Sequence, residues 1–82
     1  MVKEDPTVLE APDLVAFCIT EGIDFQPFLR KSDRKVCYKT TEDVSSVIER
    51  FYLNVPVPIA TYCKNLRMVR SMIFALKAGG KR

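Results

Sequence analysis

The 82-residue sequence contains no histidine. Histidine is the commonest general base, the usual partner of a nucleophilic serine or cysteine, and the commonest metal ligand. A Ser–His or Cys–His catalytic apparatus therefore cannot be built from this chain alone. This absence favours a protein that is not an enzyme and that uses no metal or other cofactor.

The chain also lacks a paired cysteine pattern. Its three cysteines, Cys18, Cys37 and Cys63, are odd in number, lie far apart and form no C-x-x-C pair. That spacing suits neither a disulfide framework nor a zinc site. Cys18 and Cys63 lie within apolar helical patterns, where a free thiol packs as a small hydrophobic group.

Long apolar segments are missing as well. No run of about 18 apolar residues occurs, so no membrane span is predicted. Residues 1–6 lack the basic and apolar regions of a signal peptide, and an intracellular location, cytoplasmic or nuclear, is expected. The length and the apolar fraction of 48% predict one domain over residues 1–82, with mobile ends at 1–6 and 79–82.

What the sequence does have is a strong separation of charge. Residues 1–29 hold six acidic side chains against one basic one, a net charge of −5. Residues 52–82 hold six basic side chains and no acidic one, a net charge of +6. The acidic and basic segments could pair with each other within one chain or between chains. Alternatively, the basic segment could bind a polyanion. The sequence alone leaves these uses open.

The hydrophobic pattern predicts a fold made only of helices. Helices are expected over residues 12–21, 24–31, 40–53 and 58–78, the second of them short. Residues 6–11 are interpreted as a turn. Residues 32–38 fit an extended connector or a short strand, and the connector is favoured because no second strand is predicted. The predicted fold class is all-α: a small four-helix bundle with a long C-terminal helix, an orthogonal arrangement being one option.

The last two predicted helices carry the clearest amphipathic patterns. Apolar side chains recur at i, i+3, i+4 and i+7 in residues 40–53, and a similar spacing marks one face of residues 58–78. Two prolines in residues 55–58 predict an extended elbow between them. The expected core contact joins these two helices through Val47, Ile48 and Phe51 on one side and Tyr62, Leu66, Val69 and Ile73 on the other.

The basic C-terminal segment is the strongest functional signal. The candidate nucleic-acid contacts are its cations and a second basic pair, namely Lys64, Arg67, Arg70, Lys77, Lys81, Arg82, Arg34 and Lys35. Tyr38 is the one nearby aromatic residue expected to be exposed, so no base-stacking surface is predicted. Contact with the backbone of DNA or RNA, without sequence specificity, is the expected mode. A solvated basic face balanced by the acidic segment is the competing interpretation.

Three other side chains of residues 58–78 exceed what one buried stripe requires. They are Met68, Met72 and Phe74, and they form the candidate protein interface. The sequence thus predicts a small non-enzymatic interaction or assembly module that forms a homo-oligomer or binds a protein partner. The alternative is a sequence-independent nucleic-acid-binding protein of viral or chromatin type. Neither hypothesis involves a membrane or a small-molecule substrate.

Overall fold

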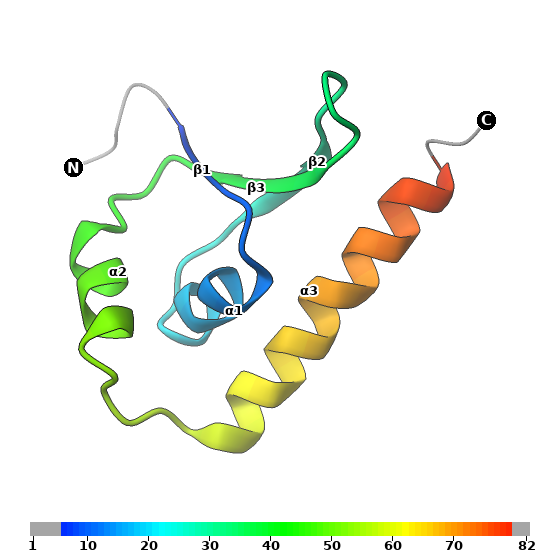
Figure 1. Cartoon of the computed structure of the whole chain (residues 1–82). Coiled ribbons are helices and arrows are strands. Elements are labelled where there is room, and N and C mark those ends of the chain that lie inside the picture. The colour runs from blue at the N-terminus through cyan, green and yellow to red at the C-terminus, as the bar shows by residue number, and fades with distance from the viewer. Residues whose placement is uncertain (1–5, 80–82) are drawn as a thin grey trace.

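A computed structural model describes residues 6–79 (Figure 1). The described chain contains six elements, β1 Thr7–Leu9, α1 Pro12–Thr20, β2 Gln26–Leu29, β3 Val36–Thr40, α2 Ser45–Tyr52 and α3 Ile59–Gly79. The strands form one antiparallel sheet in the order β1-β3-β2. The fold is therefore mixed α/β with a long C-terminal helix, and the prediction of an all-α four-helix bundle is wrong.

The sheet occupies segments that the hydrophobic pattern assigned otherwise. The predicted short helix over residues 24–31 contains β2, which pairs with β3 so that Phe28 lies opposite Cys37. Pro27 has no backbone N–H to donate, but β2 is an edge strand, where proline is tolerated. The predicted turn at residues 6–11 contains the other edge strand, β1. The predicted connector, residues 32–38, contains the first three residues of the central strand, β3.

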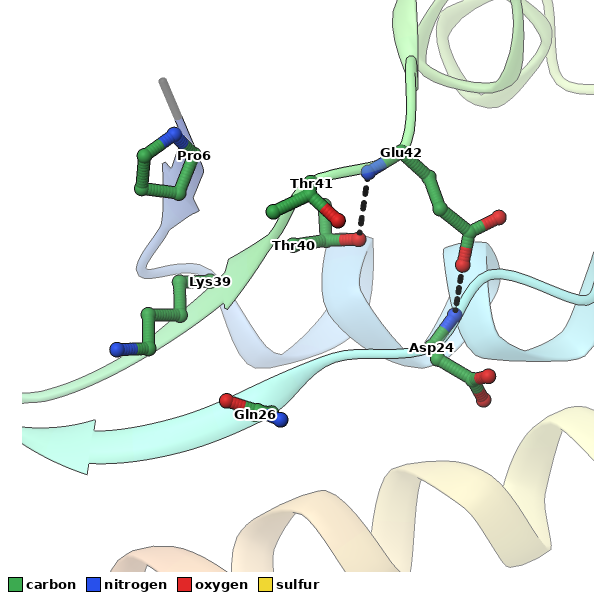
Figure 2. A pocket seen from close by; sticks show the side chains of 7 residues that line it. All are labelled: Pro6, Asp24, Gln26, Lys39, Thr40, Thr41 and Glu42. Carbon is green, nitrogen blue, oxygen red and sulfur yellow. Dashed lines mark hydrogen bonds between the residues drawn. The ribbon is translucent and has the colours of Figure 1, made fainter. Parts of the chain in front are cut away.

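The first, third and fourth of the predicted helices are present in the structure, and the start of the third lies later than predicted. α1 and α3 match the predicted ranges to within one residue at each end. α2 begins at Ser45, five residues later than the start of the helix predicted over residues 40–53, because Thr40 still belongs to β3. The Oγ1 atom of Thr40 accepts a hydrogen bond from the backbone N–H of Glu42, and the Glu42 carboxylate accepts one from the backbone N–H of Asp24 (Figure 2). These bonds fix the turn that leads from β3 towards α2.

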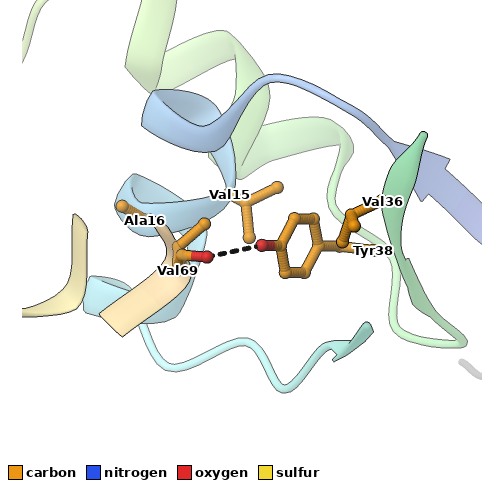
Figure 3. Close-up of a cluster of buried hydrophobic side chains, with 5 residues drawn as sticks. All are labelled: Val15, Ala16, Val36, Tyr38 and Val69. Carbon is orange, nitrogen blue, oxygen red and sulfur yellow. Dashed lines mark hydrogen bonds between the residues drawn. The ribbon is translucent and has the colours of Figure 1, made fainter. Parts of the chain in front are cut away.

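The core lies where the sheet, α1 and α3 meet. Val15 and Ala16 of α1 pack with Val36 and Tyr38 of β3 and with Val69 of α3 (Figure 3). The Tyr38 side chain is 1% exposed, and its hydroxyl donates a hydrogen bond of 2.7 Å to the backbone carbonyl oxygen of Val69. This bond joins the central strand to the middle of α3.

The predicted docking of residues 40–53 on residues 58–78 is wrong. The Phe51 ring packs edge-to-face on Phe17 of α1, with ring centroids 5.5 Å apart. α1 lies between α2 and α3 (Figure 1), and α3 packs mainly along α1. The hydroxyl of Thr20 in α1 accepts a hydrogen bond of 2.9 Å from the side-chain amide of Asn65 in α3. The predicted inner face of α3 does pack on the core, but its partners are α1 and the sheet.

The turn between β2 and β3 is held by an ion-pair cluster. Arg30 pairs with Asp33 at 2.6 Å and with Glu10 at 3.1 Å, and Lys35 pairs with Glu10 at 3.4 Å. Arg34 has a φ of 59°, in the left-handed region that a tight turn uses. The hydrogen bonds from Arg30 lower the pKa of the Asp33 carboxyl from 3.8 to about 2.

The first prediction tests the link between β3 and α3. Tyr38→Phe removes the hydroxyl that donates to Val69 and leaves the ring in place, so it should lower the free energy of unfolding by about 1 kcal/mol. Urea unfolding followed by circular dichroism measures the change. Tyr52→Phe is the matched control, because the Tyr52 side chain is 74% exposed. Equal midpoints for Tyr38→Phe and the parent would show that this bond does not stabilise the fold.

The second prediction concerns acid stability. Because folding lowers the pKa of Asp33, its ion pair stabilises the fold above the carboxyl's ordinary value of 3.8, and the stabilisation is lost as the pH falls towards about 2. Asp33→Asn should therefore unfold at lower urea than the parent near neutral pH, and the two midpoints should converge in acid. A difference that persists at the acid end would assign the effect to something other than this titration.

Candidate functional site

The described chain offers little for catalysis or metal binding. Residues 6–79 contain no group of three or more Cys, Asp or Glu side chains that could hold a metal ion. Cys18 and Cys37 are buried, and burial raises the pKa of the Cys18 thiol to about 11. A protonated and inaccessible thiol is a poor nucleophile. No helix within residues 6–79 has the length and hydrophobicity that a transmembrane segment needs.

A polar pocket lies at one end of the sheet (Figure 2). It is lined by Pro6, Asp24, Gln26, Lys39, Thr40, Thr41 and Glu42. Its charges are of both signs, and the carboxylate of Glu42 already accepts the backbone hydrogen bond from Asp24. The pocket therefore does not present a concentrated charge of one sign to a ligand.

An apolar groove opens where the end of α2, the elbow and the start of α3 meet α1. It has a volume of about 490 Å³ and is lined by Phe17, Phe51, Tyr52, Asn54, Val55, Val57, Ile59 and Tyr62. No charged side chain lines it. Tyr52, Leu53 and Ile59, at or beside its rim, are 74%, 69% and 67% exposed. We call these three residues with the groove the elbow patch.

Local structure explains why the elbow patch stays open. α2 ends at Tyr52, and Asn54 with a φ of 59° turns the chain away from the helix. Pro56 and Pro58 then keep the elbow extended, because each disfavours helix in the residue before it. The Phe51 and Tyr52 rings meet edge-to-face, with centroids 5.3 Å apart, so Tyr52 is held at the rim while Phe51 reaches inward to Phe17.

Tyr62 forms the α3 side of the groove. Its hydroxyl donates a hydrogen bond of 3.4 Å to the backbone carbonyl oxygen of Asp13 in α1. Burial, and then the neighbouring Asp13 carboxylate, raise the pKa of this hydroxyl. The groove wall is thus tied to α1 and belongs to the packed part of the molecule.

The sequence pattern did not identify the elbow patch. Helical spacing assigns Tyr52 and Ile59 to the apolar, inward faces of the helices predicted over residues 40–53 and 58–78, but both side chains are about two-thirds exposed or more. Helical spacing alone cannot show that α2 is too short, and the elbow too extended, for α2 to cover the start of α3. The double proline is the sequence signal that could have indicated a gap at this point.

A second exposed surface runs along α3. Arg67, Arg70, Phe74 and Lys77 recur at i, i+3, i+7 and i+10, so they share one face of the helix. All four are exposed, and the Phe74 side chain is 77% exposed. We call these four residues the α3 stripe. Lys64 is also exposed but lies about 100° around the helix from the centre of the stripe.

The acidic half of the chain does not neutralise the α3 stripe within residues 6–79. There Glu10 pairs with Arg30 and Lys35, and Glu21 pairs with Arg50 at 3.2 Å. In the same range no carboxylate forms an ion pair with the stripe's three cations. Glu10 and Glu21 pair instead with cations of the β2–β3 turn and of α2.

The remaining candidate nucleic-acid contacts, Arg34, Lys35, Lys81 and Arg82, lie outside the α3 stripe. Lys35 is engaged by Glu10, and Arg34 lies in the same turn, at the end of the sheet near the C-terminal half of α3 (Figure 1). Lys81 and Arg82 lie outside the described residues. Tyr38, expected to be exposed, is buried, so the exposed aromatic residue among the cations is Phe74. The argument against a base-stacking surface therefore no longer holds.

The predicted interface of Met68, Met72 and Phe74 does not form one patch. Met72 packs against the core, whereas Met68 is 40% exposed. Met68 and Phe74 are separated by about 120° around α3, so they face different directions. A partner contact by any of the three stays a prediction.

Comparison of the chain with protein-family models, with curated proteins and with solved structures finds no match. The functional argument therefore depends on the two surfaces described above.

Proposed function

We propose that this protein is a small non-enzymatic interaction module that self-associates through the elbow patch. The observation that carries the proposal is the exposure of Tyr52, Leu53 and Ile59 around one uncharged groove. Single exposed apolar residues are common on protein surfaces, but several gathered around a groove are typical of an interaction site. Burying them releases free energy at about 25 cal/mol per Å² of apolar surface.

Charge favours a second copy as the occupant of the elbow patch. The chain carries a net charge of +3, and its α3 stripe is positive, so contact between copies through the stripes is repulsive. The groove has no charged lining residue, so a twofold contact can place it against itself without bringing like charges together. Homodimer interfaces are also more apolar than other protein interfaces.

The proposed location is the cytoplasm or the nucleus. All three cysteines are free thiols, as is usual for proteins of reducing compartments. A self-associating module with unpaired cysteines fits such a compartment.

The third prediction tests self-association. Ile59→Glu puts a charge at a residue that lines the groove, within the proposed contact, and should weaken the dimer at least tenfold, because burying an unpaired charge is strongly unfavourable. Sedimentation velocity over a range of protein concentrations measures the dissociation constant. Phe74→Glu is the matched control: it adds the same charge at an equally exposed apolar position of α3, away from the groove. A parent that stays monomeric throughout, or equal effects of both variants, would contradict the proposal.

A second candidate function is sequence-independent binding of nucleic acid by α3. The observation that favours it is that, within residues 6–79, the cations of the α3 stripe have no carboxylate partner. Phosphates supply the missing negative charge, and binding them releases counterions from the nucleic acid.

The fourth prediction tests this candidate. Affinity for oligonucleotides should fall as salt rises, and Arg70→Gln should weaken binding and flatten the slope of log K against log salt by about one phosphate contact. Fluorescence anisotropy measures both. Lys64→Gln removes an equal charge from α3 outside the stripe and serves as the control. No binding at low salt, or a slope of zero, would exclude the candidate.

A further inference from the structure

The α3 stripe places an aromatic ring between cations on one helix face. We propose that the stripe is a binding surface for single-stranded nucleic acid, in which Phe74 stacks on a base while Arg67, Arg70 and Lys77 contact phosphates. This inference rests on the second candidate function and adds to it an aromatic contact that a backbone-only binder lacks.

The spacing of the stripe suits such a contact. Arg70 precedes Phe74 by one helical turn and Lys77 follows it by slightly less than one turn, so both cations neighbour the ring on the helix surface. Arg67 and Lys77, the two ends of the stripe, lie ten residue steps apart, about 15 Å along the helix axis. A positive track with an aromatic side chain in it is the arrangement that single-strand binders use.

The ring of Phe74 is available for stacking. The ring contacts within residues 6–79 involve Phe17, Phe51 and Tyr52, and a cation–π contact joins Lys39 to Phe28. Phe74 takes part in none of them and is the most exposed large apolar side chain of the described residues. Because the opposite face of α3 packs on α1 and the sheet, the stripe is already formed before a ligand arrives.

The chemistry favours a single strand over a duplex. Bases in a duplex are stacked and paired, so a side chain can reach a base face only by unstacking it, at a cost of a few kcal/mol. Bases in a single strand can turn a free face to an aromatic ring. A duplex would therefore meet only the three cations of the stripe and gain nothing from Phe74.

The stripe suits a lipid surface less well. A helix that lies in a membrane interface needs a broad apolar face to enter the lipid. The stripe contains one apolar side chain, whereas Leu66, Val69 and Ile73 of α3 face the core of the protein. Anionic vesicles are therefore the competing ligand in the test.

The fifth prediction separates stacking from charge. Phe74→Leu keeps an apolar side chain but removes the aromatic face, and it should weaken binding of the full chain to labelled oligo(dT) and oligo(U) about tenfold. Binding to a labelled DNA duplex should not change. Val8→Ala shortens an exposed apolar side chain of β1, outside both the α3 stripe and the elbow patch, and as the control it should leave both affinities as in the parent. Fluorescence anisotropy at fixed salt measures the affinity of the parent and of both variants for the three labelled nucleic acids.

The outcomes distinguish this inference from the function on which it rests. If Arg70→Gln weakens binding but Phe74→Leu does not, the phosphate contact stands and the stacking surface is wrong. If Arg70→Gln also leaves binding unchanged, both the phosphate contact and the stacking surface are wrong. Equal losses for Phe74→Leu on single strands and on the duplex also overturn the inference, because they indicate a general disturbance of α3. Binding to phosphatidylserine vesicles without binding to oligonucleotides would assign the stripe to a membrane surface instead.

Discussion

The position of α3 depends on the buried cluster around Tyr38 and Val69, which includes the hydrogen bond from the Tyr38 hydroxyl to the Val69 carbonyl oxygen. A buried hydroxyl without a partner is costly, so the central strand and the middle of α3 must lie together. With Val69 turned inward, the helical repeat turns Arg67, Arg70 and Phe74 outward. The exposure of the α3 stripe thus follows from which face of α3 packs on the core.

Sequence reasoning located the helices better than the sheet, for a physical reason. In α1 and α3, three signals indicate the same helix: the apolar spacing, a proline at the start and a glycine at or near the end. The strands have three to five residues, too few for alternation to stand out, and their pairing joins distant parts of the chain. Phe25, Phe28 and Leu29 also fit the i, i+3, i+4 spacing of a helix, so β2 was hidden within a helical pattern. Val36 and Tyr38 did alternate, but a strand is stable only with a partner.

The two candidate surfaces were visible in the sequence to different degrees. The charge pattern alone indicated the cations of α3, because a segment with basic side chains and no acidic ones can be recognised in the sequence without a structure. The exposure of Phe74 and Ile59 could not be predicted, because it depends on which element covers α3. The prediction supplied the wrong neighbour, α2, whereas the neighbour in the structure is α1. The sequence did indicate that α3 is apolar over more than one face, and Phe74 is the part of that excess that stays exposed.

α3 is a single unbroken helix of 21 residues, and it carries part of the elbow patch at its start and the α3 stripe from near its middle towards its C-terminal end. Ile59 and Phe74 are separated by about 22 Å along its axis. A pair of chains joined through their elbow patches would therefore keep both stripes uncovered and hold them at a fixed separation. Such a pair is a bivalent ligand with a rigid spacer: a strand that reaches both stripes meets the second at a high effective concentration, and a strand too short to span them gains nothing from the pairing.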